Sequence, residues 1–319
     1  MKAKNNYGQR DKNVVNIILK TIVFIILTLY AISIIYILVW GVINSLKSNV
    51  DFLVKNNIFG LPNPEFSSDE LFKLNNYRLI LEKFYIERSI SYWRNEVLIE
   101  HTTRSGLLEM IVNALYFSSV QAVLPTLFSA IMAYLCSRFK EFKSITIWYY
   151  VALVAMMVPA LGSYPAEISI LQNLGVYDTY LGILLQKSFY GGTYFFVFHA
   201  FFQGVSGTYA EAAELDGASQ YRIFFQIILP LIGKAFTTIA LIQFVAGWND
   251  FRLPLMYMPT HPSVAYGVYN LTLETAPVGI ARLTTRLAAC MLLAVPILIV
   301  FLIFKEKLMG NVSLGGLKE

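Results

Sequence analysis

The chain has 319 residues, of which 56% are hydrophobic and 14% charged. Since a soluble domain carries about 25% charged residues, this composition excludes an ordinary soluble protein and indicates a chain that needs lipid. The net charge of +5 does not indicate nucleic-acid binding, because the basic residues are divided among the two ends and the loops and form no stripe.

The N-terminal part of the chain predicts a basic tail followed by a membrane span. The tail, residues 1–16, contains four basic residues, Lys2, Lys4, Arg10 and Lys12. The apolar run at 17–45 is too long for a signal-peptide core and is not followed by a small-residue cleavage site. We therefore expect 17–45 to be a retained transmembrane helix.

The segment 46–106 is predicted to be an extracytoplasmic insertion. It is long and polar in patches, and a connection of this length usually has structure or function of its own. Apolar residues lie among charges at Leu79-Ile80-Leu81, Phe84-Tyr85-Ile86 and Trp93, which predicts one or two short amphipathic helices on the outer surface. We expect the insertion to contact a partner or to cap a dimer.

The segment 107–305 is predicted to be a transmembrane domain. A span needs about 20 mostly apolar residues, and five further runs qualify, at 110–136, 145–170, 179–203, 232–258 and 286–304. The run at 145–170 contains Pro159, Gly162 and Pro165, so it is either a broken helix beside a cavity or a helix with a proline kink. The predicted fold class is an all-α polytopic membrane protein with six transmembrane helices.

The distribution of Lys and Arg predicts the orientation in the membrane. Basic residues cluster in the N-terminal tail, at 138–143 and directly after the last span, at Lys305 and Lys307. Six spans place both ends on one side, so we expect the tails 1–16 and 306–319 to be cytoplasmic.

The loop at 204–231 is polar at its start and lies between two apolar runs. Glu211, Ala212, Ala213 and Asp216 form an acidic, small-residue turn of helix, and Gly217 allows the backbone to bend. Ala218 follows, and Ile227-Ile228-Leu229-Pro230 leads the chain back to the bilayer. An amphipathic hairpin that anchors neighbouring helices is the structural alternative.

Two later stretches and a few intramembrane polar residues also stand out. Trp248-Asn249-Asp250-Phe251 lies near the end of the fifth predicted span, and the chain ends in a glycine-rich stretch at 308–318. Asn113, Gln121 and Gln243 are amides within apolar runs. They are candidates for a solute path, although helix–helix hydrogen bonds explain such residues at least as often.

The loop resembles the cytoplasmic coupling loop of ABC importer permeases, which has Glu-Ala-Ala, a Gly four residues later, and Ile-x-Leu-Pro after nine more. Trp248-Asn249-Asp250-Phe251 and the glycine-rich ending resemble the carbohydrate-uptake type, and within it the smaller permease subunit of maltose-transporter-like systems. The resemblance covers most of 107–319. It implies three kinds of partner: a homologous second permease, two ATP-binding cassette subunits and an extracellular solute-binding protein.

The resemblance also implies site residues. The ATPase-coupling residues would be Glu211, Ala212, Ala213, Asp216, Gly217 and Ala218, and the substrate path would include Asn113, Gln243, Trp248, Asn249 and Asp250. Helix capping and interfacial anchoring are the structural alternative for Trp248-Asn249-Asp250.

The predicted function is import of a sugar or oligosaccharide across the bacterial plasma membrane by alternating access. The chain has no nucleotide-binding motif, no catalytic residues, no metal-ligand spacing and no cofactor motif, so the energy is expected to come from partner ATPases. The alternatives are a permease for a peptide or amino acid, a secondary transporter and a membrane scaffold.

Overall fold

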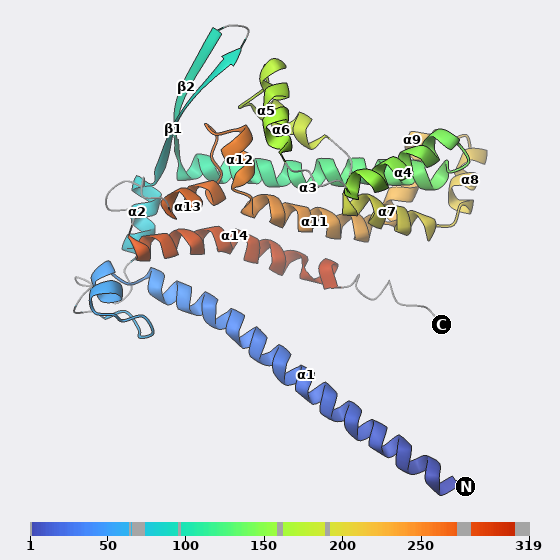
Figure 1. Cartoon of the computed structure of the whole chain (residues 1–319), viewed down its shortest axis with the longest axis horizontal. Coiled ribbons are helices and arrows are strands. Elements are labelled where there is room, and N and C mark those ends of the chain that lie inside the picture. Colours follow the sequence, from blue (N-terminus) through green and yellow to red (C-terminus); the bar gives the residue numbers. More distant parts are fainter. Residues whose placement is uncertain are drawn as a thin grey trace. The chain divides into compact units, whose positions relative to one another are not determined.

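The computed structural model describes residues 2–63, 65, 74–94, 97–157, 162–188, 192–272 and 282–309, and these are mostly helical (Figure 1). The chain divides into two compact units, each described by itself. Unit 1 comprises Met1–Glu82 and Val278–Met291, and unit 2 comprises Lys83–Pro277 and Leu292–Glu319.

Unit 1 contains α1 (Lys2–Ser45), the π-helical turn η1 (Val50–Val54), most of α2 (Asn75–Lys83) and the start of α14 (Leu283–Met309). Within α1, Asn16–Ser45 is a 30-residue helix that is long and apolar enough to cross a membrane, as expected for 17–45. Buried Asn76 holds this unit together: its Nδ2 donates to the carbonyls of Ser45 and Lys47, and its Oδ1 accepts from Thr285.

Unit 2 is organised around α3 (Leu107–Arg138). At a rise of ~1.5 Å per residue its 32 residues extend about 48 Å, more than the ~30 Å hydrocarbon core of a bilayer. Helices α7 (Thr193–Gln203) and α11 (Gly233–Asn249) pack along it. A Cβ at Gly247 would lie 3.0 Å from the Cα of Ser118, so a glycine allows α11 to approach α3 this closely.

The stretch at 85–106 is a β-hairpin, and the prediction of amphipathic helices there was wrong. Strand β1 (Tyr85–Arg94) pairs antiparallel with β2 (Val97–Gly106), from Tyr85 opposite Gly106 to Arg94 opposite Val97. The two strands are rich in β-branched and aromatic residues, which favour a pleated surface. Only α2 is helical in the expected region, so the fold is mostly helical rather than all-α.

Two predicted spans consist of separate helices. The run at 145–170 contains α4 (Lys143–Met157) and α5 (Ser163–Asn173), and the run at 179–203 contains α6 (Tyr180–Lys187) and α7. Gly162 and Gly192 precede α5 and α7 with φ of 78° and 72°, values that favour glycine. Of the two predicted forms of the run at 145–170, the structure therefore shows the broken helix, with α5 beginning after Gly162, rather than one helix with a proline kink.

The fifth predicted span comprises α11 and α12 (Arg252–Tyr257), and α13 (Val264–Thr272) follows. Among the described residues three helices can each cross a membrane, Asn16–Ser45, Leu107–Arg138 and Leu283–Phe304. A fourth span is added if Gln220–Leu231 and Gly233–Asn249, bent by 81°, are taken together. The count of six spans therefore stays a prediction. Residues 310–319, most of the glycine-rich ending, lie outside the residues that the structure describes.

Candidate functional site

The loop at 204–231 folds as a short helix followed by a sharp reversal. Helix α8 (Thr208–Leu215) ends in a hydrogen-bonded cap, in which the Ala218 N–H donates to the carbonyl of Ala213 and the Gly217 N–H to that of Glu214. Gly217 has a φ of 78°, the left-handed conformation that this helix ending requires. The chain continues through α9 (Gln220–Arg222), η3 (Ile223–Ile228) and α10 (Leu229–Leu231).

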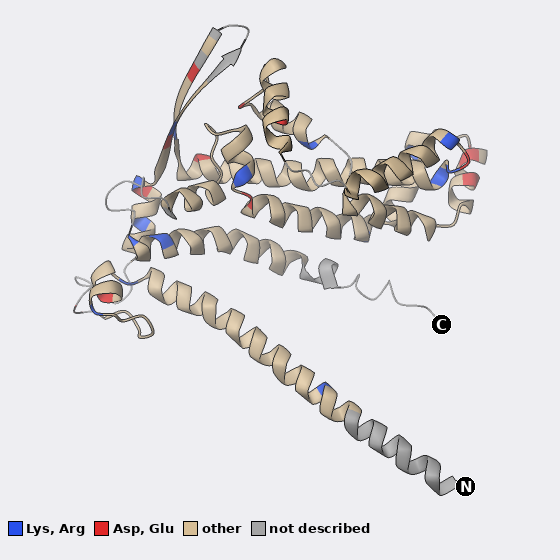
Figure 2. Ribbon diagram, viewed as in Figure 1, with Lys and Arg blue, Asp and Glu red and all other residues tan. Residues whose placement is uncertain are grey.

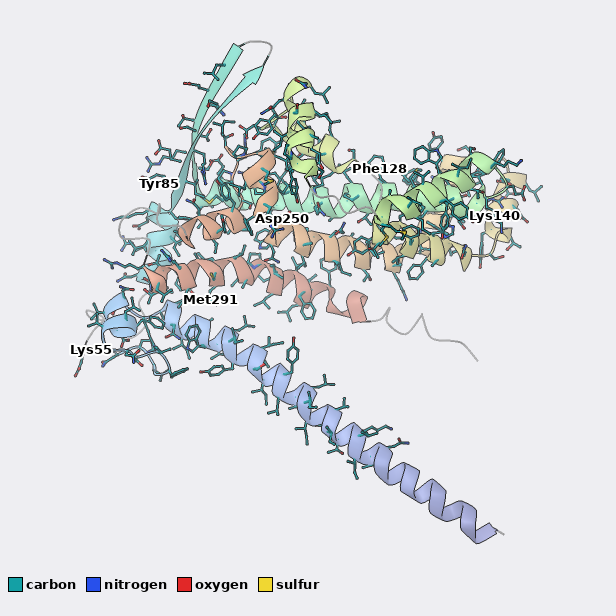
Figure 3. The ribbon with its side chains drawn as sticks, in the orientation of Figure 1. Lys55, Tyr85, Phe128, Lys140, Asp250 and Met291 are labelled. Carbon is teal, nitrogen blue, oxygen red and sulfur yellow. The ribbon has the colours of Figure 1, made fainter. Side chains whose placement is uncertain are left out.

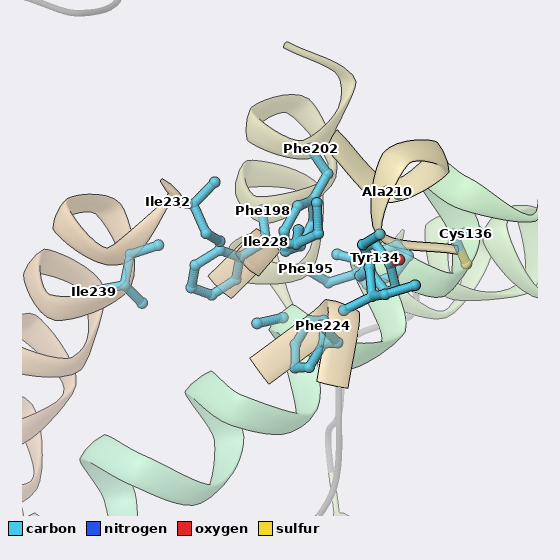
Figure 4. Close-up of a cluster of buried hydrophobic side chains, with 14 residues drawn as sticks. Tyr134, Cys136, Phe195, Phe198, Phe202, Ala210, Phe224, Ile228, Ile232 and Ile239 are labelled. Carbon is cyan, nitrogen blue, oxygen red and sulfur yellow. The ribbon is translucent and has the colours of Figure 1, made fainter. Parts of the chain in front are cut away.

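One face of this loop is buried in a cluster of apolar side chains (Figure 4). Ala210 and Ala213 of α8 pack there with Ile223, Phe224 and Ile228 of η3. The other buried members come from α3, α7, α11 and the junction between α10 and α11: Ala130, Ala133, Tyr134, Cys136, Phe195, Phe198, Phe202, Ile232 and Ile239. Burial of this face fixes α8 against the ends of α3 and α7, so the loop is a packed element.

Ion pairs add a second attachment of α8 to α3. Arg138, near the end of α3, lies 3.3 Å from Glu214 and 3.8 Å from Glu211. The Gln220 amide donates to Glu214 at 2.8 Å, and this bond, together with Arg138, holds the pKa of the Glu214 carboxyl below its ordinary value. Figure 2 shows acidic and basic residues gathered at this end of α3.

The opposite face of the loop is exposed and partly apolar. Leu215 is 91% exposed and Tyr221 80% exposed, and Ala212, Asp216 and Gly217 are also exposed. Such side chains on a rigid, packed element form a surface suited to a protein partner.

The hairpin and the loop lie at opposite ends of α3. Strand β2 ends at Gly106, where α3 begins, and Arg138 contacts α8 at the other end. Helix α3 is longer than the hydrocarbon core is thick, so it is long enough to separate the hairpin from the loop across a bilayer.

A cavity of about 610 Å³ lies between these ends. Among the described residues it is lined by Gln121 of α3, Ser163, Tyr164 and Glu167 of α5, Gln186 and Lys187 of α6, and Ala246, Gly247, Asn249, Asp250, Phe251, Arg252, Leu253 and Tyr257 of the α11–α12 region. At ~1.5 Å per residue, Gln121 lies about 21 Å from the start of α3 and about 26 Å from its end. The cavity is therefore midway along α3, and Figure 3 shows Asp250 between Tyr85 near one end and Lys140 at the other.

Both carboxylates of the cavity are held by hydrogen bonds. Glu167 Oε2 accepts from the Tyr257 hydroxyl at 2.5 Å and from Gln186 at 3.4 Å. Asp250 Oδ1 accepts from the N–H groups of Arg252 and Leu253 at the start of α12. Ionisable residues within membrane-spanning segments are rare and almost always face the interior of the helix bundle or a water-filled cavity.

The described lining of the cavity includes Asn249, Asp250 and the candidate amide Gln121. Three other predicted path residues do not belong to it. Asn113 is buried, donates to the carbonyl of Pro262 and accepts from the Tyr180 hydroxyl. Trp248 is also buried, and its Nε1 donates to the carbonyl of Leu293. Gln243 lies half-buried in α11.

Sequence reasoning did not assign Glu167, Gln186, Lys187 or Tyr257 to a site. The signal was present in part, because Glu167 is a charge close to the end of one apolar run and Lys187 is a charge within the next. These side chains come together only because separate helices begin at α5 and end at α6. The sequence did not decide whether the run at 145–170 is broken or only kinked.

Comparison with known proteins gives one family and several relatives. A model of the family described as binding-protein-dependent transport system inner membrane component matches residues 100–309, which are 210 of the 319 residues. The chain is 28% identical over 214 residues to the arabinooligosaccharides transport system permease protein of Halalkalibacterium halodurans, covering 65% of this chain and 72% of the relative. It is 27% identical over 235 residues to the diacetylchitobiose uptake system permease protein of Streptomyces coelicolor, covering 70% and 74%.

A solved structure is similar along most of the chain. It is a bacterial ABC transporter involved in the import of the acidic polysaccharide alginate, with a TM-score of 0.69, 17% sequence identity, and coverage of 91% of this chain and 96% of that chain. At this identity the likeness shows the fold.

Proposed function

Because the chain belongs to the family of binding-protein-dependent transport system inner membrane components, matched over residues 100–309, we propose that it is the permease subunit that carries a sugar or oligosaccharide. It is a multi-pass transport component of the bacterial cell membrane. The observation that carries the proposal is the loop at 204–231, fixed by its apolar face to the end of α3 and exposing Leu215 and Tyr221.

The chemistry of the mid-span cavity supports a sugar as the solute. Sugars are uncharged and rich in hydroxyls, so a site for them offers amides and aromatic faces. The cavity contains the amides of Gln121, Gln186 and Asn249 and the rings of Tyr164, Phe251 and Tyr257. Four charged residues also line it, Glu167, Lys187, Asp250 and Arg252, and both carboxylates already accept hydrogen bonds from the chain itself. Relatives whose names include arabinooligosaccharides and diacetylchitobiose support the same substrate class.

The mechanism we propose is alternating access driven from outside this chain. Two ATP-binding cassette subunits would dock on the exposed face formed by Ala212, Leu215, Asp216, Gly217 and Tyr221, and their closure would move α8 as a rigid lever. Shifting a two-state element from 1:99 to 99:1 takes about 5.5 kcal/mol of differential binding. The buried face and the Arg138 ion pairs support transmission of that energy to α3 without slipping.

The remaining partners and the topology belong to the same proposal. A homologous second permease would complete the path, and an extracellular binding protein would deliver the solute on the hairpin side. The chain would have cytoplasmic tails at 1–16 and 306–319, an outer insertion at 46–106, and six spans in 17–45 and 107–305.

Uptake by a deletion strain on a panel of labelled oligosaccharides and peptides tests the substrate class. We expect loss of uptake of one oligosaccharide, restored by the wild-type gene. Loss of peptide uptake with every sugar unaffected would contradict the sugar assignment and leave the family untouched.

A further inference from the structure

Glu167, on α5, is an acid of the mid-span cavity that sequence reasoning assigned to no site. A charged group within a membrane-spanning bundle is costly unless other groups compensate it. Lys187 and Arg252 line the same cavity, yet among the described residues no Lys or Arg lies within ion-pair distance of Glu167. Hydrogen bonds are therefore the main support of this carboxylate.

Three polar side chains serve the carboxylate of Glu167. The Tyr257 hydroxyl on α12 and the Gln186 amide on α6 both donate to its Oε2, and the Ser163 hydroxyl also hydrogen-bonds to this carboxyl group. A carboxylate has about four lone-pair sites for donors. Three donors from the chain therefore leave room for one more, on a group that lines the cavity.

Tyr257 is itself held from the side away from the cavity. Asp178, in the turn between α5 and α6, donates its N–H to the Tyr257 carbonyl at 3.1 Å. Its buried carboxylate accepts from the N–H and the hydroxyl of Thr260, at 3.2 and 2.6 Å. Asp178 has a φ of 57°, a conformation that a non-glycine residue keeps only where its surroundings hold it. The segment from Tyr257 to Thr260 is thus fixed, and with it the hydroxyl that meets Glu167.

The remaining capacity of this carboxylate suits a hydroxyl of a sugar. A hydroxyl donates one hydrogen, and a hydrogen bond to a charged acceptor is roughly twice as strong as one between neutral groups. A polar group held in place to bond a hydroxyl rejects a solute that lacks it. The rings of Tyr164 and Tyr257 line the same cavity and offer apolar faces to the carbons of a sugar.

We propose that Glu167 determines which sugar the cavity accepts, because its carboxylate accepts a hydrogen bond from one hydroxyl of the solute. Tyr257 and Gln186 are positioning residues that fix this carboxylate, and Asp178 fixes Tyr257 from outside the cavity. The inference rests on the proposed function, since it takes a sugar as the solute. If Glu167 only joined α5 to α12, its substitution would lower stability and leave the affinity for a sugar unchanged.

The test measures binding of sugars to the whole transporter, with its second permease and ATPase subunits, in lipid nanodiscs and without a binding protein. Raffinose, trehalose and diacetylchitobiose are titrated separately, and the rise in unfolding temperature gives the apparent affinity for each sugar. The unfolding temperature without sugar reports stability. Uptake of the same sugars, labelled, by cells that carry the transporter is measured in parallel.

Two substitutions and their combination separate a contact with the sugar from a positioning role. Glu167→Gln keeps the size of the side chain and removes its charge, so it should lower the affinity at least about tenfold, the effect of losing a hydrogen bond to a charged group. Tyr257→Phe keeps the ring and removes one donor to Glu167, so it should lower the affinity about threefold. Because Tyr257 acts through Glu167, the double variant should bind no more weakly than Glu167→Gln alone.

Tyr116→Phe is the matched control. It removes a tyrosine hydroxyl that joins α3 to the Tyr180 carbonyl of α6, outside the described lining of the cavity, so we expect an unchanged affinity. If the Glu167→Gln complex does not assemble, Glu167→Asp replaces it. That variant keeps the charge and draws it away from the solute and from Tyr257, so it should also bind more weakly.

Each outcome decides a part of the proposal. Weaker binding in both single variants, with no further loss in the double variant and none in Tyr116→Phe, supports it. Equal affinity of the wild type and the Glu167 variant overturns the role of Glu167. Losses that add in the double variant overturn the positioning role of Tyr257. A sugar that cells take up through the transporter but that the complex does not bind overturns the site. If none of the sugars is bound or taken up, the proposed function is contradicted, and the inference with it.

Discussion

The loop at 204–231 and the mid-span cavity are built in opposite ways. The loop is contiguous: its acidic turn, its left-handed glycine and its return to the apolar cluster all lie between Glu211 and Pro230. The cavity takes its lining from α3, α5, α6 and the α11–α12 region, which are far apart in the sequence. A site made by one local stretch can be recognised from sequence, whereas a site made where helices break needs the fold.

The charged residues of the loop and those of the cavity also differ in what they do. In the loop, Arg138, Glu211 and Glu214 hold one element against another at an exposed end. In the cavity, Glu167 and Asp250 are fixed by hydrogen bonds midway along α3. We therefore expect substitutions in the loop to uncouple ATP hydrolysis, and those in the cavity to change transport of the solute.

Reversing one charge in the loop should have the largest effect. Glu211→Lys should leave the complex inserted but lower substrate-stimulated ATP hydrolysis roughly 30-fold or more, because it replaces the ion pair with Arg138 by two like charges next to the docking face. ATP hydrolysis by the reconstituted complex measures this effect, and Glu211→Gln is the milder control. Normal substrate-stimulated ATP hydrolysis by the Glu211→Lys variant would contradict the proposed role of the loop in coupling to the ATPase.

Two adjacent residues near the cavity should behave differently. Asn249 lines the cavity, so Asn249→Ala should lower uptake about tenfold with normal expression and basal ATP hydrolysis. Buried Trp248 donates to the carbonyl of Leu293, so Trp248→Phe should cost about 1–3 kcal/mol of stability and reduce the amount of folded protein. Uptake and membrane content are measured together, and equal loss of expression in both variants would return Asn249 to a structural role.

Substitution of two glycines by alanine separates the cost of a packing clash from the cost of a strained backbone. Gly247→Ala would bring a Cβ to 3.0 Å from the Cα of Ser118, which we expect to cost about 1–3 kcal/mol. Gly217→Ala meets nothing within 4 Å, and its cost, about 1–2 kcal/mol, would come from the left-handed backbone alone. Unfolding of the purified complex ranks the two, and a larger loss at Gly217 would contradict the packing role of Gly247.

The smallest effect concerns pH at the end of α8. The folded-state pKa of Glu214 lies below its ordinary value of 4.5, because Gln220 and Arg138 stabilise the carboxylate. Its contribution to loop stability is therefore complete above pH 4.5 and is lost as the pH falls through the lower, folded-state pKa. The protection of the α8 amides from hydrogen exchange, measured against an unfolded peptide at the same pH, should fall on acidification in the wild type. A Glu214→Gln variant with the same fall in protection would exclude this carboxyl as its source.

The sequence predicted the helical membrane fold, the first span and the position of the loop, because long apolar runs and a contiguous motif are local signals. It did not predict the hairpin, since Phe84-Tyr85-Ile86 and Trp93 among charges fit an amphipathic helix as well as a strand. Pairing with Val97–Gly106, which only the tertiary structure supplies, decides between them.

Of the residues that line the mid-span cavity, the sequence pointed to Asn249 and Asp250, where a recognisable motif lies, and to Gln121, an amide within an apolar run. Glu167 and Tyr257 are 90 residues apart in the sequence, yet they share a hydrogen bond. Asn113 is an amide in an apolar run, and the structure shows it hydrogen-bonded to the Pro262 carbonyl and the Tyr180 hydroxyl. Its place on the solute path stays a prediction.

Cysteine labelling in intact cells tests most directly the claim that the loop and the hairpin face opposite sides of the membrane. On a Cys136→Ala, Cys290→Ala background, a membrane-impermeant reagent should label Ser91→Cys in the hairpin of intact cells. It should label Ser219→Cys only after the membrane is opened. Labelling of Ser219→Cys in intact cells, with Ser91→Cys protected, would contradict the account by placing the loop where no ATPase can reach it.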